Sequence, residues 1–271
     1  MDDHDDDIVN RGLQFDVSTL IQRRRLLGLF AGLGLAAVAG CTADDDDLAP
    51  AGPERTGAAT ATTSREIPGE TAGPFPGDGS NGPNVLARSG IVRGDIRASL
   101  DPPSTVAGGV PLIIDMTVLD LAAGGGPLAG GAVYVWQCDR EGRYSMYSPG
   151  VTQETYLRGV GEVDSSGRVR FTSVFPGCYA GRWPHIHFEV YRSLASATNA
   201  GSAVATSQIA LPEDACRMVY ATDGYEQSAD SLSRVSLATD GVFRDGWADE
   251  LGAITGSIGA DLTVALSVPV R

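Results

Sequence analysis

The chain has 271 residues and a formal net charge of −14. Such an excess of negative charge argues against nucleic-acid binding, which usually requires a basic patch. Residues 67–271 are enough for one domain with a substantial hydrophobic core.

Residues 1–41 have the pattern of an export signal. Three consecutive arginines, Arg23 to Arg25, precede an apolar run from Leu26 to Gly40, and Cys41 follows. The run is shorter than the ~20 residues that cross a bilayer comfortably as a helix. The arginines also suit a twin-arginine signal, so Sec and Tat export both stay open.

The end of the apolar run predicts a lipid anchor. Val38-Ala39-Gly40-Cys41 resembles a bacterial lipobox, in which the cysteine is lipidated before cleavage. An ordinary signal peptide with a chance cysteine is the alternative. We expect the protein to be held by lipid at the outer face of a bacterial cytoplasmic membrane. Residues 42–66 are acidic and then rich in Ala, Thr, Pro and Gly, which predicts a disordered tether.

The pattern in residues 67–271 predicts a single all-β domain. Glycine is abundant, helical periodicity is scarce, and short apolar or alternating segments are separated by turn signals. Strands are predicted over 110–121, 132–137, 167–175, 185–192, 202–211 and 260–270, with a short helix over 212–222. This spacing favours a β-sandwich or barrel with long loops and little helix over an alternating α/β fold.

Three cysteines lie in this predicted domain: Cys138, Cys178 and Cys216. An exported protein can form disulfides, but three cysteines leave one over. Cys178 with Cys216 is the pair we expect, and the other pairings stay open.

Two of the three histidines in the chain, His185 and His187, lie one residue apart in a predicted strand. Side chains at i and i+2 share a strand face, so both imidazoles project to one side. Ile186, Phe188 and Val190 project to the other side, as the natural core face. The pair can ligate a metal from a rigid support, or it can be a coincidental exposed pair.

Two tyrosines extend this pattern. Tyr144 follows a turn after a predicted strand, and Tyr179 follows Pro176-Gly177 and precedes His185 by six residues. Two phenols and two imidazoles are an unusual ligand set for zinc. Phenolate is a hard, charged oxygen ligand that suits a trivalent, strongly Lewis-acidic metal, for which ferric iron is the obvious candidate.

The sequence leaves open which tyrosines are the ligands and what Arg182 contacts. Tyr147 or Tyr156 could replace one of the two tyrosines as a ligand. Arg182, between Tyr179 and the histidines, could simply pair with Glu189 or Asp139.

The ordered motifs resemble the intradiol ring-cleavage dioxygenases, a family that includes protocatechuate 3,4-dioxygenases and catechol 1,2-dioxygenases. The resemblance rests on W-x-C-D-x-x-G-x-Y-S, G-x-V-x-F-x-S-V-x-P-G-x-Y, R-x-x-H-I-H-F and T-S-Q-I, in that order. It extends from about Glu70 to the C-terminus. It implies the β-sandwich of that family.

The resemblance also implies a metal centre. In that family non-haem Fe(III) is held by two tyrosines and two histidines, and the motif positions imply as ligands Tyr144, Tyr179, His185 and His187. Arg182 matches the active-site arginine of the family, and Gln208 matches a glutamine near the substrate ring.

The implied activity is that of an oxidoreductase. O2 would cleave a catechol between its two hydroxylated carbons and give a cis,cis-muconate-type product that contains both oxygen atoms. Tyr179 would leave the metal and act as an internal base while Tyr144 stays bound. Arg182 would stabilise negative charge on the substrate, and Gln208 would orient it.

One departure bears on the substrate. Only the segment AGRWP separates Tyr179 from His185, where the usual enzymes have a longer insertion. Catechol, protocatechuate, hydroxyquinol and larger catechols therefore all stay open, as does the oligomeric state. The competing class is a non-catalytic, transthyretin-like β-sandwich lipoprotein that binds a small molecule or a carbohydrate. The four-ligand pattern favours the enzyme, because a binding module has no need of it.

Overall fold

The computed structural model describes residues 65–101, 105–198 and 202–271. The predicted export signal, Cys41 and nearly all of the predicted tether lie outside these residues. In the part of the chain that is described, no helix is long and apolar enough to cross a membrane.

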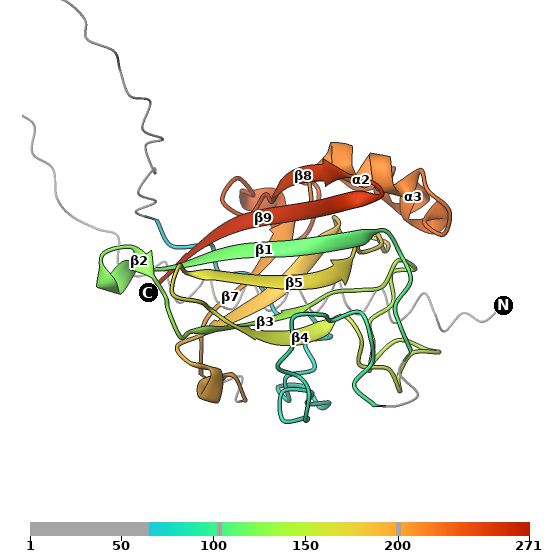
Figure 1. Ribbon diagram of the computed structural model, residues 1–271. Coiled ribbons are helices and arrows are strands. Elements are labelled where there is room, and N and C mark those ends of the chain that lie inside the picture. The colour runs from blue at the N-terminus through green and yellow to red at the C-terminus, as the bar shows by residue number, and fades with distance from the viewer. Residues whose placement is uncertain (1–64, 102–104, 199–201) are drawn as a thin grey trace, which may run out of the picture.

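Two β-sheets pack face to face, and Figure 1 shows them as two layers. The first sheet consists of β1 (Pro111–Asp120), β2 (Gly126–Pro127), β5 (Arg168–Val174), β8 (Ala253–Ser257) and β9 (Ala260–Val270). In it β1 pairs antiparallel with β2 and β5 and parallel with β9. The second sheet is antiparallel in the order β4-β3-β6-β7, from β3 (Ala132–Trp136), β4 (Arg158–Glu162), β6 (His185–Tyr191) and β7 (Ala203–Ala210). The predicted all-β sandwich is confirmed.

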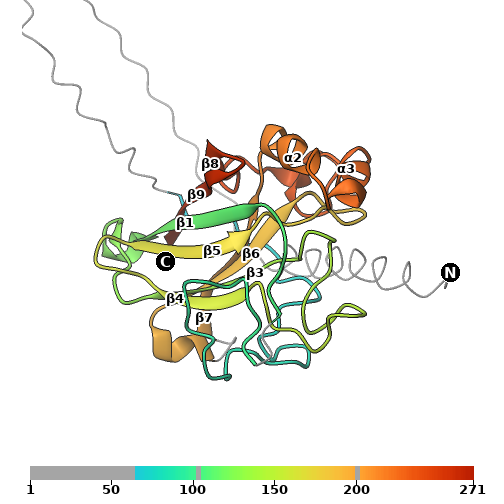
Figure 2. The same ribbon diagram turned by 45° about the vertical axis from the view of Figure 1, so that its right-hand side comes forward.

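Helices are short and lie at the margins. The α-helices α2 (Glu213–Tyr220) and α3 (Glu226–Leu232) lie together at one end of the sandwich (Figures 1 and 2). The 3-10 turns of the described residues include η1 (Leu121–Ala123), η2 (Leu194–Thr198) and η4 (Phe243–Asp245). The helix expected over 212–222 is confirmed as α2, and it begins directly after the extended Pro212.

The main core lies between the two sheets and follows strand alternation. In β5, Val169 and Phe171 are buried while Arg168 and Arg170 are exposed. In β6, Ile186, Phe188 and Val190 belong to the same core cluster. The predicted inward set of β6 is therefore confirmed, and the two histidines occupy the opposite face.

That opposite face is buried as well. Every residue of β3 and β6 is buried, because a second apolar cluster covers the outer face of this sheet. Val85, Leu86 and Ile91 supply the cover from the N-terminal part of the described chain. The fold therefore encloses His185 and His187 in the interior, so the exposed-pair alternative is wrong.

All six predicted strands are present, but β2, β4 and β8 were not predicted. The sequence of β4 lacks a strand pattern for a steric reason. A Cβ atom at Gly159 would lie 2.5 Å from Ile96 Cγ2, and one at Gly161 would lie 2.5 Å from Val169 Cγ2. Close packing of neighbouring side chains requires glycine at both positions, and this removes the β-branched pattern that marks a strand.

The expected disulfide between Cys178 and Cys216 is wrong, because the structure has Cys138, Cys178 and Cys216 as buried free thiols. Cys178 Sγ lies 3.5 Å from the carbonyl oxygen of Arg182, and Cys216 Sγ lies 3.9 Å from that of Leu211. Burial, reinforced by Asp240, raises the pKa of Cys178 to about 12. The thiols therefore act as small core residues.

Candidate metal centre

Four side chains converge at the end of β6. His185 and His187 come from β6, Tyr144 from the loop after β3, and Tyr179 from the loop between β5 and β6. The two Nε2 atoms are 3.0 Å apart, and His185 Nε2 lies 3.3 Å from Tyr144 Oη and 3.2 Å from Tyr179 Oη. Both histidines and Tyr144 are buried, whereas Tyr179 is half-buried. The structure thus brings together all four predicted ligands.

A backbone carbonyl fixes the tautomer of His185. Its Nδ1 lies 2.5 Å from the carbonyl oxygen of Trp183. Because a carbonyl only accepts hydrogen bonds, Nδ1 carries the proton and donates it, and Nε2 presents a lone pair to the tyrosines. This arrangement is common for metal-bound histidines, whose second nitrogen donates to a carbonyl or carboxylate.

Burial keeps both imidazoles neutral. It lowers the pKa of His185 to about 3, with Arg182 adding to the effect. It also lowers the pKa of His187, and the neighbouring His185 contributes. Neutral imidazole is the form that binds a metal.

The pKa of the Tyr144 phenol shifts in the opposite direction. Burial raises the pKa of Tyr144 well above its ordinary value, and the nearby Tyr179 raises it further. Without a compensating cation, Tyr144 therefore stays protonated at neutral pH. A strongly charged metal ion is what would convert it to phenolate.

The donor set fits a single metal ion. Metal–nitrogen bonds of about 2.0–2.1 Å place neighbouring ligands about 3 Å apart, close to the separations of 3.0, 3.2 and 3.3 Å found here. Over the described ranges, no group of three or more His, Cys, Asp and Glu residues could hold a metal, so this site needs its tyrosines. Two hard phenol oxygens with two imidazoles fit ferric iron.

Neighbouring strands hold His187 in place. Trp136 of β3 and Gln208 of β7 are its partners across the sheet. The Trp136 ring stacks on the imidazole with centroids 4.9 Å apart and an interplanar angle of 4°. The rigid strand and the stacked ring together limit rotation of this ligand.

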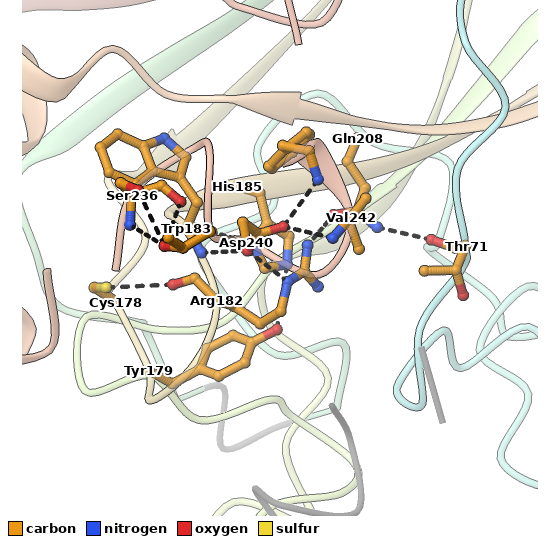
Figure 3. Close-up of polar contacts among 12 residues, drawn as sticks. Thr71, Cys178, Tyr179, Arg182, Trp183, His185, Gln208, Ser236, Asp240 and Val242 are labelled. Atoms are coloured by element: carbon orange, nitrogen blue, oxygen red, sulfur yellow. Dashed lines mark hydrogen bonds and ion pairs between the residues drawn. The ribbon is translucent and has the colours of Figure 1, made fainter. Parts of the chain in front are cut away.

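Arg182 lies beside the histidines and is held from two sides. Its Nε donates to Asp240 Oδ2 at 3.0 Å, and its Nη2 donates to Gln208 Oε1 at 2.7 Å (Figure 3). Gln208 Nε2 in turn donates to the carbonyl oxygen of Thr71 at 2.8 Å. The structure pairs Arg182 with Asp240, a partner that the sequence did not indicate, in place of the alternatives Glu189 and Asp139.

The alternative tyrosines have other roles. Tyr147 Oη accepts from the Gly77 amide and donates to Asn81, both at 2.8 Å. Tyr156 Oη donates to Asp139 at 2.9 Å. Neither hydroxyl contacts the histidines, so Tyr144 and Tyr179 are the phenols of this site.

Comparisons with known proteins point to dioxygenases. A family model described as "Dioxygenase" matches residues 81–199, which include all four converging side chains. An intradiol ring-cleavage dioxygenase from Tetranychus urticae is 27% identical, with a TM-score of 0.53 over 67% of this chain and 87% of that one. The fold is that of an intradiol ring-cleavage dioxygenase.

Two further solved structures are similar at lower identity. A second dioxygenase structure is 24% identical, with a TM-score of 0.55 over 67% of this chain and 86% of that one. The dioxygenase domain of a carbohydrate-binding fusion protein from Streptomyces sp. SirexAA-E is 19% identical, with a TM-score of 0.47 over 76% of this chain and 97% of that one. A comparison with curated protein sequences finds no significant match.

Proposed function

We propose that this protein is a non-haem Fe(III) dioxygenase that cleaves a catechol between its two hydroxylated carbons. O2 is the co-substrate, and the product is a cis,cis-muconate-type dicarboxylic acid. The observation that carries the proposal is the convergence of two neutral imidazoles and two phenols, with donor atoms separated by 3.0–3.3 Å. The dioxygenase match over residues 81–199 supports it.

The ligands of the iron would be Tyr144, Tyr179, His185 and His187. When bound, ferric iron supplies the Lewis acidity that draws electron density from a catecholate, so that a ring carbon can react with O2. The protein supplies rigid donors and neutral imidazoles.

The two tyrosines differ in a way that suits different roles. Tyr144 is 1% exposed and packed within the second apolar cluster. Tyr179 is half-buried and belongs to the loop whose next residues, Ala180 and Gly181, are exposed. Tyr179, as a phenolate when iron is bound, would therefore be the ligand that can change partner and accept a proton from a catechol hydroxyl at its Oη, while Tyr144 stays in place.

Arg182 would provide electrostatic stabilisation. A fixed positive charge beside the substrate favours the negative charge that develops on the ring. Gln208, expected to orient the substrate directly, has its carboxamide oxygen on Arg182 and donates to Thr71. We therefore assign Gln208 an action on the substrate through Arg182.

The short connection between Tyr179 and His185 supports a catechol-class substrate in an open site. Its first residues, Ala180 and Gly181, are exposed. A longer insertion would cover this side of the centre.

The visible spectrum of the purified, iron-loaded protein tests the function. We expect a red-brown tyrosinate-to-iron band that shifts when catechol is added, together with O2 consumption and a muconate product. Labelled O2 should place both heavy oxygen atoms in the product. A protein that binds no iron, or that binds it without colour, would disprove the proposal.

We also propose that the chain is exported and anchored through a lipid on Cys41. The support is sequence alone: the arginines, the apolar run and the lipobox-like end. Labelled palmitate should be incorporated into the full chain in bacteria, and Cys41→Ala should abolish both labelling and membrane association. Equal labelling of the variant would refute the anchor.

A further inference from the structure

We propose that Asp240 is a positioning residue of this centre: it fixes Arg182 beside the metal ligands and at the same time holds the Trp183 segment that orients His185. The inference rests on the proposed function. It assigns a role to a residue that lies 32 positions beyond Gln208 and outside every motif of the sequence, in the turn between α3 and η4.

One carboxylate makes all of these contacts. Asp240 Oδ2 accepts from Arg182 Nε at 3.0 Å and from the Trp183 amide at 2.7 Å. Oδ1 accepts from the amides of Val242 and Phe243, at 2.8 and 3.0 Å. Figure 3 shows the carboxylate between the Arg182 guanidinium and the Trp183 backbone. All four acceptor positions of a carboxylate are thereby used.

The connection to the metal ligands is short. The Trp183 amide donates to Asp240, while the Trp183 carbonyl accepts from His185 Nδ1. A shift of the Trp183 backbone would therefore rotate the imidazole that presents Nε2 to the tyrosines. The ring of Phe243, whose amide Asp240 also binds, lies 6.4 Å from the His185 ring and 5.9 Å from Arg182 Cζ.

Arg182 and Asp240 also form a buried ion pair. Arg182 is 2% exposed and Asp240 is 0% exposed. A buried guanidinium needs a counter-charge and a defined direction, and a hydrogen-bonded carboxylate supplies both. Gln208 on Nη2 and Asp240 on Nε together fix the guanidinium plane. This pre-organisation is what an electrostatic catalyst requires.

A matched control exists elsewhere in the fold. Asp120 Oδ1 accepts from the amides of Ala122 and Ala123, and its Oδ2 accepts from Arg192 Nη1 at 2.6 Å. It therefore has the same kinds of partner as Asp240, but it lies at the start of η1 and outside the centre. Asp120→Asn should leave iron binding and turnover unchanged.

The test compares iron-loaded Asp240→Asn with that control and the wild type. We expect iron content within the wild-type range, kcat lower by about 10²-fold, the scale of losing one pre-organised electrostatic group, and KM nearly unchanged. In an Arg182→Met background, Asp240→Asn should cause a much smaller further loss, because only its contact with the Trp183 amide is then left to lose. Independent, multiplying losses would overturn the proposal.

A second readout needs no iron. In the iron-free protein, ¹⁵N NMR should show a slowly exchanging Arg182 Nε–H in the wild type and a fast-exchanging one in Asp240→Asn. If Asp240→Asn fails to fold, Asp240→Asn with Gln208→Glu restores a carboxylate to the guanidinium and should recover folding and part of kcat. Failure of this rescue assigns Asp240 a purely structural role. An inactive wild type would instead refute the proposed function itself.

Discussion

His185 Nδ1 donates to the carbonyl oxygen of Trp183 across 2.5 Å, and this contact directs Nε2 toward the two tyrosines. The same short segment supplies Tyr179 and Arg182. A metal ligand, a positive charge and the carbonyl that sets a tautomer are therefore fixed by seven consecutive residues, 179–185. The rigidity of β6 and the brevity of this segment together determine the geometry of the centre.

Loss of either histidine should remove the metal. We expect His185→Gln and His187→Gln to retain less than about a tenth of the wild-type iron, since a metal ligand matters more than the outer partners whose loss costs about 10–100-fold in affinity. Iron per chain, measured by mass spectrometry, checks this. Glu189→Gln is the control, because Glu189 lies on the same strand face but bonds to Tyr191. Full iron in both histidine variants would contradict the site.

The visible band should depend on two of the nearby tyrosines and not on the other two. Tyr144→Phe and Tyr179→Phe should each weaken and shift the charge-transfer band, and the double variant should be colourless. Tyr147→Phe and Tyr156→Phe should keep the wild-type spectrum, because their hydroxyls bond to Gly77, Asn81 and Asp139 instead. Absorption spectra recorded at equal iron content compare the band of each variant with that of the wild type. Full colour in the double variant would exclude both phenols as ligands.

Much of the architecture could be predicted from local pattern. The alternation of Ile186, Phe188 and Val190 with His185 and His187 correctly gave both faces of β6. Alternation could not show that the histidine face is covered, because the covering residues Val85, Leu86 and Ile91 are distant in sequence. Burial of that face is a tertiary property.

Some residues of the site could likewise be predicted from the sequence, and Asp240 could not. The two tyrosines, two histidines and Arg182 belong to motifs, and the structure brings them together. Asp240 follows Thr239 and precedes Gly241, a sequence that suits any turn, so nothing local distinguishes it. Its importance arises only when the fold places it against Arg182.

Arg158 should be a major source of stability near the centre. It is 0% exposed, and its guanidinium donates to the carbonyls of Phe75, Pro76 and Ser145 and to the hydroxyls of Tyr134 and Ser145. Arg158→Met leaves several buried acceptors without partners, so we expect a loss of about 3–5 kcal/mol in the free energy of unfolding.

Denaturant unfolding measures that loss, and Arg170→Met is the control. The Arg170 side chain is 56% exposed, so its replacement should change stability by no more than about 0.5 kcal/mol. Since the ring of Phe75 lies 5.0 Å from that of Tyr144, Arg158→Met should also alter the visible band. Equal stability of the two variants would show that the buried hydrogen bonds contribute little.

Glu250 should make the protein less stable as the pH rises through neutrality. Its side chain is fully buried, and Ser207 Oγ donates to its Oε1 at 3.4 Å. Burial raises its pKa to about 8, with Glu70, Asp249 and Asp240 as the neighbouring negative groups. In the unfolded chain a glutamate has a pKa of about 4.3. Between these values the folded state holds a proton that the unfolded state has released.

Stability therefore falls as pH rises from about 4.5 to 8, because the folded state binds more protons than the unfolded one over that range. Glu250→Gln removes this dependence. The variant should match the wild type at pH 4 and exceed it at pH 8–9 by on the order of 3–5 kcal/mol. Urea unfolding at a series of pH values gives the difference between the two curves, with the exposed Glu213→Gln as control. Parallel curves for wild type and Glu250→Gln would show that Glu250 ionises normally in the folded protein.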